Sequence, residues 1–515
     1  MSAVPVGEWN VAKVAGSRTD RLRWKRELGT PRERRYVRVA GVAPDVEIKP
    51  FINSLDTLLR GVAERVFYVK SGEEFVRPPR PKPGHFDRTL QGVVGQLETL
   101  LPSTAPCSHQ HFVDAYSGRK RQSYQKALDD LRAGRNSLES DAMLRVFVKY
   151  EKTDWTNKLD PVPRIISPRD PRFNIRLGRY LKPLEKKIFR SIKKLFGHET
   201  VIKGFNAVRS AAILREKWDM FHDPVAVGLD AMRFDQHVGI DALKCEHRVY
   251  LKCFRQRKHR VRLAKILAKQ LVNRCYGRTE DGVVEYSIEG TRMSGDMNTS
   301  LGNCLLMCLL IKAFADEKSV RISLANNGDD CQIFMERCEL EHFMDGLNDW
   351  FLGMGFNMKV EDPVFEFDQV EFCQTNPVFD GDIWIMCRNP HNAIVKDSVM
   401  LKSWDSPGLF RGWLDAVGTG GLALAGGLPI FQELYALYVR SGERRVVSQD
   451  LIPWNLRCMK EGLNRGYGSV SPEARASFYW AFNVTPDEQE CLEQYYARLG
   501  IVSAPGLYSP RSVFR

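Results

Sequence analysis

Residues 322–335, which read I-S-L-A-N-N-G-D-D-C-Q-I-F-M, constrain the local fold more tightly than any other part of this chain. Two apolar runs, 322–325 and 331–335, lie on either side of an Asn-Asn-Gly-Asp segment. Asn-Gly between apolar runs is the strongest short-range indication of a β-hairpin, because both residue types tolerate a positive φ. The pattern predicts a hairpin with Asp329 and Asp330 at its tip.

The two adjacent carboxylates of this tip repel each other unless water or a cation compensates them. Hard divalent ions such as Mg²⁺ take oxygen ligands of this kind, so a metal site is one interpretation. An ordinary exposed turn also uses Asn, Gly and Asp, so a solvated hairpin is the other. The stretch alone leaves both interpretations open.

The chain has 515 residues, enough for about two to four packed subdomains. Its hydrophobic content of 43% and charged content of 27% are typical of a soluble globular protein. The net charge of +13 favours a polyanionic partner, either nucleic acid or an acidic membrane surface. The 12 cysteines show no C-x-x-C spacing and are expected to be reduced core residues of an intracellular protein.

The sequence shows no signal peptide and no apolar segment of spanning length. The first ten residues lack an apolar core, and the longest apolar segment, 305–315, is interrupted by Lys312. A segment of that length is too short for a bilayer core of about 30 Å. We therefore expect any membrane association to be peripheral or through a partner.

A second set of carboxylates follows a short apolar run at 225–229, which is typical of a buried strand. The run delivers Asp230 at its end, and Asp235 follows in D-A-M-R-F-D before a helix with one apolar side. A carboxylate at the end of a buried strand is in position for a cleft. Helix capping is the structural alternative for Asp235.

A loop rich in small residues, 290–299, leads into an apolar helix. Its glycines allow close approach to a backbone or a sugar. Thr299 and Asn303 are expected one turn apart on one helix face, where both could hydrogen-bond sugar hydroxyls. As a plain helix start, the same residues would need no function.

Two segments are unusually basic. Residues 18–38 are dense in arginine, and a solvated basic arm and a phosphate-binding segment are both open interpretations. Residues 152–176 combine prolines with cations that could line a channel for triphosphates or template. Those cations are Lys152, Lys158, Arg164, Arg169, Arg172 and Arg176.

The remaining expectations concern local structure. Residues 77–84 are predicted to form an extended, proline-rich strap, and the glycine-rich residues 417–429 a mobile loop or a turn between helices. Residues 356–360 and 370–374 are predicted strands, the first carrying Lys359. Ser-Pro at 471–472 and Thr-Pro at 485–486 are each typical of a helix start.

The ordered motifs DAMRFD, SGDMNTSLGN and NGDD resemble the palm motifs of viral RNA-dependent RNA polymerases. More narrowly, GLDAMRFDQHV, GTRMSGDMNTSLGNCLL and NNGDDCQIF are similar to the tombusvirus family of plant positive-strand RNA viruses. The match is densest over residues 149–374. Three motifs in the right order are far more specific than any one of them.

The resemblance implies an α+β fold of the right-hand polymerase type, with fingers, a palm containing an antiparallel sheet, and a mostly helical thumb. Residues 1–140 would form a basic extension and a fingers-associated region, and 141–225 the fingers with the basic motif. Residues 226–390 would form the palm, with a fingers insertion around 255–290. Residues 391–515 would form the thumb and C-terminal region.

The resemblance also implies the site residues. Asp230 and Asp329 would bind two Mg²⁺ ions with help from Asp330, and Mn²⁺ accepts the same oxygen donors. Lys359 would protonate the pyrophosphate. The ribose hydroxyls would be recognised by Asp235, Ser294, Thr299 and Asn303, the triphosphate by Lys152 and Arg164, and the primer or template supported by Gly295, Phe372, Cys373 and Gln374.

The implied function is RNA-directed RNA synthesis that replicates a positive-strand viral genome by two-metal nucleotidyl transfer. The implied partners are template and nascent RNA, NTPs, a viral auxiliary replication protein and host factors. The implied location is the host cytoplasm, at membrane-associated complexes reached through a partner. Polymerases of this family are commonly translated as extensions of a membrane-anchored leader, and we expect this chain to be the part separated from it or a separately made product.

Two other functions fit part of the pattern. A reverse transcriptase would share the palm chemistry, but the expected sugar-binding residues are hydroxyl-binding types where a bulky aromatic would exclude the 2′-hydroxyl. A non-catalytic RNA-binding replication protein would explain the charge but would leave the carboxylates without a role.

Overall fold

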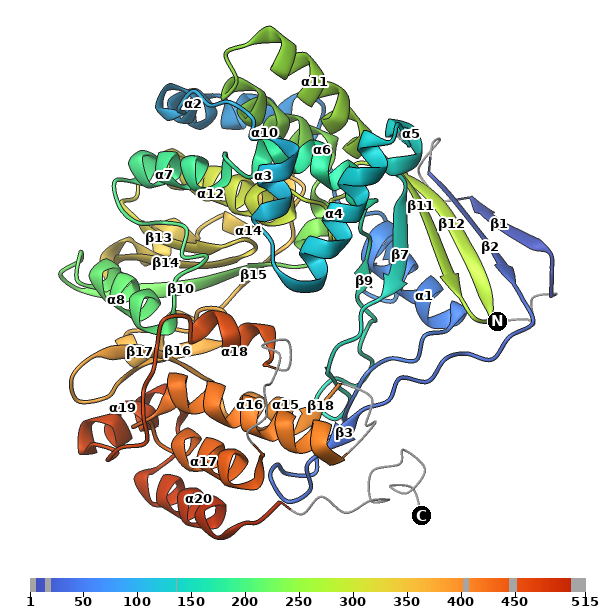
Figure 1. Cartoon of the computed structure of the whole chain (residues 1–515). Helices are drawn as coiled ribbons and strands as arrows, with labels where there is room; N and C mark the ends of the chain where they lie inside the picture. Colours follow the sequence, from blue (N-terminus) through green and yellow to red (C-terminus); the bar gives the residue numbers. More distant parts are fainter. Residues whose placement is uncertain (1–5, 14–19, 136, 402–406, 444–451, 502–515) are drawn as a thin grey trace.

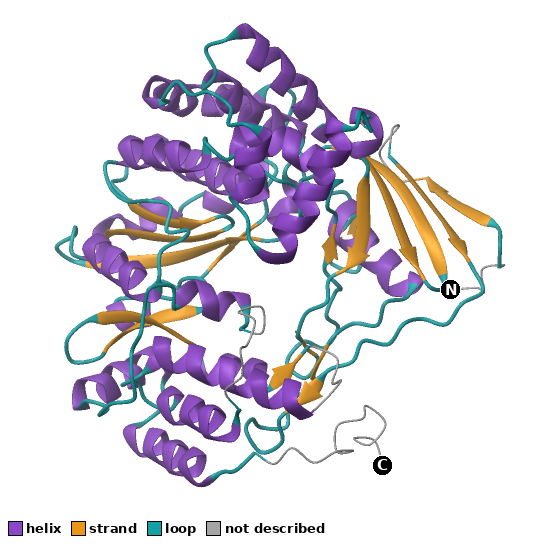
Figure 2. Ribbon diagram, in the orientation of Figure 1, coloured by secondary structure: helices purple, strands orange, loops and turns teal. Residues whose placement is uncertain are grey.

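A computed structural model describes residues 6–13, 20–135, 137–401, 407–443 and 452–501. Helices and strands are mixed along the chain, in agreement with an α+β fold. Two sheets dominate, a four-stranded one near the middle of the molecule and a six-stranded one at its edge (Figure 1). Helices surround the first sheet, and the C-terminal helices form a separate layer below it in Figure 2.

The four-stranded sheet has the strand order β13-β14-β10-β15 and is antiparallel throughout. Its strands are β10 (Pro224–Ala231), β13 (Ser323–Asn327), β14 (Asp330–Glu336) and β15 (Met358–Val360). In β10, residues 225–229 are all buried, because α12 (Thr299–Lys318) and its neighbours pack on one face and α8 (Ala207–Trp218) on the other. A strand covered on both faces shows the continuous apolar run found in the sequence.

Helix α12 (Thr299–Lys318) is the central core helix. It is longer than the apolar segment predicted from the sequence, and by length and composition alone it could cross a membrane. However, 78% of its apolar window is buried inside the protein. A helix that is apolar on all sides because other elements surround it needs no membrane to explain its composition.

The remaining helices of the first 400 residues cover these sheets and connect them. They are α1 (Leu55–Val62), α2 (His85–Leu100), α3 (His109–Asp114), α4 (Gly118–Arg132), α5 (Leu138–Asp141), α6 (Pro171–Leu181), α7 (Glu185–Phe196), α9 (Phe234–His237), α10 (Ile240–Lys252), α11 (Arg257–Leu267), α13 (Leu340–Met344), α14 (Leu347–Gly353) and α15 (Pro390–Asp397).

The six-stranded sheet brings together segments that are far apart in the sequence. Its order is β1-β2-β12-β11-β7-β9. The strands are β1 (Trp9–Lys13), β2 (Arg21–Arg26), β7 (Leu144–Val148), β9 (Ile165–Ile166), β11 (Val272–Thr279) and β12 (Gly282–Glu289). Part of the arginine-rich stretch is therefore a paired strand of this sheet and not a free arm.

The C-terminal region is helical, with α16 (Pro407–Ala425), α17 (Phe431–Ser441), α18 (Trp454–Met459), α19 (Pro472–Phe482) and α20 (Pro486–Arg498). Both predicted helix starts are confirmed. The Ser471 hydroxyl accepts a hydrogen bond from the backbone of Ala474, and Thr485 forms a capping box with Glu488.

The prediction of a mobile loop or a turn between helices at 417–429 is wrong over most of its length, because α16 extends to Ala425; the turn into α17 occupies only the residues after it. The glycines serve close packing of α16 on α17. A Cβ built on Gly421 would lie 2.2 Å from the Tyr435 ring, and one on Gly418 would lie 2.7 Å from the backbone nitrogen of Val439. Only glycine allows the two helix backbones to approach this closely.

Residues 37–49 connect the C-terminal helices to the region of the six-stranded sheet. Strand β3 (Val37–Arg38) pairs with β18 (Val399–Met400), and β4 (Ile48–Lys49) pairs with β8 (Thr153–Asp154). The hydroxyls of Tyr495 and Tyr496 on α20 donate to carbonyls of the same segment. This N-terminal segment therefore ties the two regions together across the molecule (Figure 1).

Two small two-stranded sheets complete the structure, one formed by β5 (Val69–Ser71) and β6 (Glu74–Val76), the other by β16 (Thr375–Phe379) and β17 (Trp384–Arg388). The predicted strand at 370–374 is wrong, since pairing begins at Thr375. The preceding residues form a tight turn, which is described with the candidate site.

Candidate active site

The predicted β-hairpin is present, but its turn is shifted by one residue. Asn327 pairs with Asp330, so the loop consists of Gly328 and Asp329, and Gly328 has a φ of +87°. The buried Asn326 side chain braces the turn by donating to the Gly328 carbonyl at 2.7 Å. Asp329 is therefore at the tip, whereas Asp330 begins β14.

Strand pairing places Asp230 between two functional groups. In the register of the central sheet, Asp230 on β10 is opposite Asp330 on β14 and opposite Lys359 on β15. Residues opposite each other in antiparallel strands have Cα atoms about 4.5–5.5 Å apart and point to the same face. Three sequence-predicted residues thus form one row across three strands, next to Asp329 at the hairpin tip.

The carboxylates of this row have perturbed acidities. Burial raises the pKa of Asp329 to about 6, and the negative charges of Asp235, Asp330 and Asp230 add to the effect. Burial and the charge of Asp230 likewise raise the pKa of Asp330 to about 6. Asp230 and Asp329 nevertheless reach solvent, so protein atoms crowd these carboxylates without sealing them off from water.

This donor set fits a divalent cation bound together with a substrate. The described residues contain no group of three or more His, Cys, Asp or Glu side chains arranged to hold a metal ion. Mg²⁺, however, is usually held by one or two carboxylates plus waters and substrate phosphates. Mutually repelling aspartates with raised pKa values are the oxygen donors that such a cation would stabilise.

Asp235 does not cap a helix, because the N-cap of α9 is Arg233. Its carboxylate instead accepts hydrogen bonds from the Ser294 hydroxyl and, at 2.8 Å, from the Asn303 amide. Three of the four residues expected to contact the sugar are thus in direct contact, although they come from α9, from a loop and from α12. The fourth, Thr299, donates its hydroxyl to the Met293 carbonyl at 3.2 Å.

A buried ion pair that no sequence motif predicts supports this arrangement. The Nε of Arg292 donates to the Oδ1 of Asn303 at 3.0 Å, and its other guanidinium nitrogens bind both oxygens of Glu246. The side chains of Arg292 and Glu246 are only 1% and 0% exposed. Their signal in the sequence was weak, since one charge lies in a loop and the other on a helix 46 residues away.

The ion pair determines which way the Asn303 amide faces. A guanidinium can only donate hydrogen bonds, so Asn303 must present its oxygen to Arg292 and its amino group to Asp235. Glu246 in turn accepts from Tyr250 at 2.7 Å and from Asn298 at 2.5 Å. The network therefore fixes the donor and acceptor pattern of the predicted sugar-binding residues.

Gly295 lets the loop pack against the segment that contains β9. Its φ is +112°, and a Cβ there would lie 3.3 Å from the Pro168 nitrogen. The backbone of Ser167 donates to the Ser294 carbonyl at 2.7 Å. Arg169, which is buried, bonds Asp296 of the same loop at 2.6 Å and so has a structural contact.

The two predicted triphosphate cations have different surroundings. Arg164 is 57% exposed and 3.2 Å from Glu151, so its guanidinium remains accessible. Lys152 instead donates to the backbone carbonyl of Lys396 next to the C-terminal helices, and burial lowers its pKa to about 8. The structure does not bring Lys152 together with the carboxylate row, because this contact holds its amine elsewhere.

A tight turn lies against the hairpin tip. Cys373 and Gln374 both have positive φ values, 55° and 61°, and Phe372 and Thr375 close the turn with two backbone hydrogen bonds. This geometry is that of a two-residue turn with positive φ at both central positions. The Asn327 amide donates to the Cys373 sulfur at 3.1 Å, which joins the turn to the hairpin.

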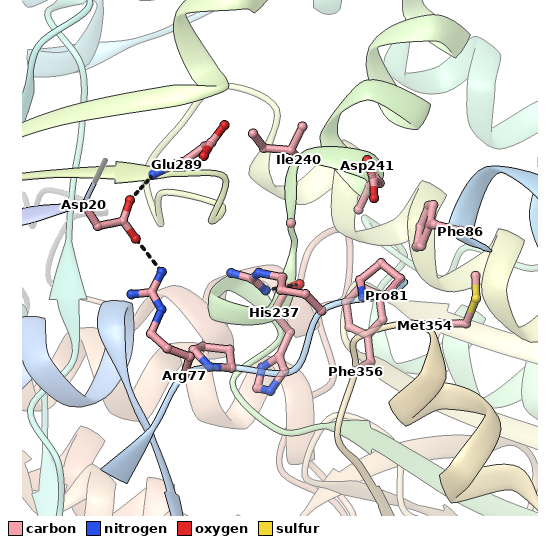
Figure 3. A pocket seen from close by; sticks show the side chains of 14 residues that line it. Asp20, Arg77, Pro81, Phe86, His237, Ile240, Asp241, Glu289, Met354 and Phe356 are labelled. Atoms are coloured by element: carbon pink, nitrogen blue, oxygen red, sulfur yellow. Dashed lines mark hydrogen bonds and ion pairs between the residues drawn. The ribbon is translucent and has the colours of Figure 1, made fainter. Parts of the chain in front are cut away.

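A separate cavity of about 380 Å³ lies beneath the proline-rich strap (Figure 3). Arg77 of the strap forms an ion pair with Asp20 there, and Arg80 donates to the carbonyl of His237 at 2.9 Å. Residues 77–82 form neither helix nor strand, and Arg80 also donates to the Gln236 carbonyl at 3.3 Å, so the strap lies against α9. None of the sequence-predicted site residues lines this cavity, so it is distinct from the carboxylate row.

A family model described as viral RNA dependent RNA polymerase matches residues 22–503. This match covers nearly the whole chain, and the chain belongs to that family. Within this family, the chain is similar to the polymerases of several plant viruses.

Relatives named RNA-directed RNA polymerase are similar over most of the chain. That of oat chlorotic stunt virus is 52% identical over 514 residues, covering 96% of this chain and 68% of the relative. Those of turnip crinkle virus and tobacco necrosis virus (strain A) are both 41% identical, covering 92% and 90% of this chain and 61% and 64% of the relatives. The chain thus spans roughly two thirds of their length, and the predicted resemblance to the tombusvirus family is confirmed.

Proposed function

We propose that this chain catalyses template-directed RNA synthesis, joining an NTP to the 3′ end of an RNA with release of pyrophosphate. The observation that carries the proposal is the row formed by Asp330, Asp230 and Lys359 beside the Asp329 hairpin tip. In the reaction, the 3′ oxygen forms a bond to the α-phosphorus and loses its proton. The bond from the α-phosphorus to the pyrophosphate oxygen breaks, and the pyrophosphate takes up a proton.

Asp230 and Asp329 would hold two Mg²⁺ ions, with Asp330 assisting. Bound Mg²⁺ lowers the pKa of the attacking hydroxyl and neutralises the leaving pyrophosphate. Mn²⁺ would bind through the same oxygens. Burial and neighbouring carboxylates raise the pKa of Asp329 and of Asp330, and a bound cation would offset both causes, which supports this role.

Lys359 would donate the proton to pyrophosphate. Its side chain is 61% exposed and its closest carboxylate is Glu361 at 3.7 Å, so the amine is accessible to a substrate. Arg164, also accessible, would stabilise the negative charge of the triphosphate. Lys152 is engaged by the Lys396 carbonyl, so the proposal gives the triphosphate role to Arg164 alone.

Asp235, Asn303, Ser294 and Thr299 would select ribonucleotides. Their side chains offer hydroxyl, amide and carboxylate groups that can bond the 2′- and 3′-hydroxyls of the sugar. A reverse transcriptase, the alternative enzyme, would use a bulky side chain to exclude the 2′-hydroxyl. The polar character of this group favours RNA synthesis.

The proposed right hand follows the sheets. The palm, residues 226–390, would contain the four-stranded sheet, and the thumb, residues 391–515, would contain α15 to α20. The fingers would combine residues 1–140, 141–225 and the insertion at 255–290. Strands from all three of these segments share the six-stranded sheet, which supports treating them as one unit.

The proposed partners are template and nascent RNA, NTPs, a viral auxiliary replication protein and host factors. We propose that the polymerase works in the host cytoplasm, in membrane-associated complexes that it reaches through a partner. Gly295 and the turn at Phe372, Cys373 and Gln374 would support the template and the primer end, since both lie beside the proposed reaction centre.

The test is incorporation by the purified chain on a short primed RNA template with Mg²⁺. We expect NTPs to be incorporated in preference to dNTPs, and Asp329→Ala to abolish incorporation while RNA binding is retained. Asp345→Ala is the matched control, because Asp345 is an exposed carboxylate paired only with Lys318 among the described residues. Preference for dNTPs would favour the reverse transcriptase. Full activity of Asp329→Ala would refute the proposed metal site.

A further inference from the structure

The six-stranded sheet has one face against the protein core and one face toward solvent. Buried side chains such as Val146, Val284 and Tyr286 pack with α1 on the inner face. The alternate residues of the same strands point the other way, and several of them are exposed. In Figure 2 this sheet stands at the edge of the molecule.

The strand register shows which side chains share the outer face. One row runs from Arg23 on β2 through Glu285 on β12 and Tyr276 on β11 to Arg145 on β7. The adjacent rows contain Arg21, Ser287 and Arg274 on one side and Trp9, Lys25, Val283 and Arg278 on the other. Phe147 follows Arg145 two residues along β7, so it shares this face.

The outer face is strongly basic. It carries six cations, namely Arg21, Arg23, Lys25, Arg145, Arg274 and Arg278, against two carboxylates, Glu285 and Glu289. Arg23 pairs with Glu285 and Arg278 with Glu27. Among the residues that the structure describes, the other four form no ion pair. A surface shaped only by solubility mixes both signs of charge, so unpaired cations side by side indicate a polyanionic ligand.

Exposed aromatic side chains lie among these cations. Trp9 and Phe147 are 42% and 43% exposed, and the Arg23 guanidinium lies 4.7 Å from the centre of the Trp9 ring. Exposed aromatic rings between cations on an open sheet are how many proteins stack the bases of single-stranded RNA. An anionic lipid surface would engage the cations but has no bases for the rings, so the combination favours RNA.

We propose that the outer face of the six-stranded sheet is a second RNA-binding surface, which binds single-stranded RNA through its phosphates and bases. The proposal rests on the proposed function only in the choice of RNA as the polyanion. The sheet ends at β9, which directly follows Arg164 in the chain and pairs with the strand that carries Phe147. RNA on this surface would therefore lie next to the segment proposed to contact the triphosphate.

The main test removes four charges by combining Arg21→Gln, Lys25→Gln, Arg145→Gln and Arg274→Gln. We expect the slope of log affinity against log salt, measured with a 30-nucleotide single-stranded RNA, to become shallower by about 3. This value follows because each of the four lost phosphate contacts contributes roughly 0.7 to the slope. Incorporation on a short template already bound at the catalytic site should stay unchanged. An unchanged slope would overturn the proposal.

The matched control removes the same charge from α11 by combining Arg257→Gln, Lys258→Gln, Arg262→Gln and Lys265→Gln, all exposed residues. We expect a much smaller change in slope for this variant. Equal changes would show that only net charge matters, which would overturn a specific surface. If the four-charge variant of the outer face loses binding to vesicles of anionic phospholipid but keeps its RNA binding, the face binds a membrane, and the proposal is overturned.

The aromatic contribution is tested with Trp9→Ala combined with Phe147→Ala. Loss of stacking should lower RNA affinity about 10-fold or more at every salt concentration without changing the slope. Unchanged RNA affinity in a folded variant would show that Trp9 and Phe147 do not stack on RNA bases, which would overturn that part of the proposal. Asp329→Ala distinguishes the two proposals, since it should abolish incorporation and leave binding to the outer face intact.

Discussion

Glu246 and Arg292 form a two-pronged ion pair with almost no solvent contact, and Arg292 continues from it to the amide of Asn303. Charges buried this deeply are costly unless each is fully paired. Here the pair also orients an amide that contacts Asp235. If Asp235 and Asn303 bind the sugar as proposed, Glu246 is a positioning residue for them, although it does not itself contact Asp235.

We predict that Glu246→Gln weakens discrimination between NTPs and dNTPs. An uncharged partner leaves Arg292 buried without compensation, so its hold on Asn303 should loosen. The ratio of kcat/KM for an NTP to that for the matching dNTP should fall about 10-fold, equivalent to roughly 1.4 kcal/mol. Asn303→Ala should lower the ratio at least as much.

Tyr250→Phe is the control for this prediction, because it removes one hydrogen bond to Glu246 and leaves Arg292 paired. It should change stability slightly and the nucleotide ratio very little. If Glu246→Gln lowers stability but leaves the ratio unchanged, the ion pair supports only the core.

We predict that Lys359→Met slows incorporation by about 10²-fold with little change in KM, the size expected for loss of a general acid. Lys359→Arg separates two roles, because arginine keeps the charge but does not release its proton. If proton donation matters, the arginine variant should be slow as well. Recovery of the full rate with arginine would make the role purely electrostatic.

The same pair of variants should differ in their pH dependence. Burial raises the pKa of Asp230, and the positive charge of Lys359 opposes this rise. In Lys359→Met that pKa should increase further, which would move the acidic limb of the rate profile to higher pH. Lys359→Arg should leave the limb in place.

We predict that Asp329→Asn stabilises the folded protein at pH 7.5 in the absence of divalent cations. The folded pKa of about 6 lies above the value of about 3.9 for an unfolded aspartate, so the folded state binds the proton more tightly. Stability therefore falls as the pH rises from about 4 to about 6 and stays low above that range. The neutral amide avoids this cost.

Thermal unfolding of both forms checks the prediction. The variant should unfold about 1–3 °C higher at pH 7.5 and at the same temperature as the wild type at pH 4. Mg²⁺ should raise the unfolding temperature of the wild type more than that of the variant. Asp345→Asn should show neither effect, and a lower unfolding temperature for Asp329→Asn at pH 7.5 would contradict the electrostatic argument.

We predict opposite effects for two neighbouring glycines of α16. Gly421→Ala should destabilise the protein by about 1–3 kcal/mol, because the new Cβ would lie 2.2 Å from the Tyr435 ring. Gly420→Ala should stabilise it by about 0.5–1 kcal/mol, because its Cβ would be 3.4 Å from Ile452 and alanine favours the helix. Denaturant unfolding measures the change in the free energy of unfolding for each variant. Equal changes for both variants would show that α17 shifts to accommodate the new methyl group and would contradict the prediction.

Elements defined by neighbouring residues were readable from the sequence. The hairpin around Gly328 and the helix starts at Ser471 and Thr485 depend on contacts within a few residues, and the strand that carries Asp230 is marked by its continuous apolar run. Even so, the turn was predicted one residue away from its observed position. The ordered motifs also determined the family, since residue order along the chain is itself the signal.

Only the tertiary structure decided the contacts between distant segments. The role of Arg292 depends on Glu246, 46 positions earlier, and the outward face of β2 depends on pairing with β12. Glycines that favour a loop by composition became helical because α17 packs against them, and Lys152 was drawn to the Lys396 carbonyl. Local preferences differ by about 1 kcal/mol or less per residue, so packing and buried charge pairs override them once the chain is folded.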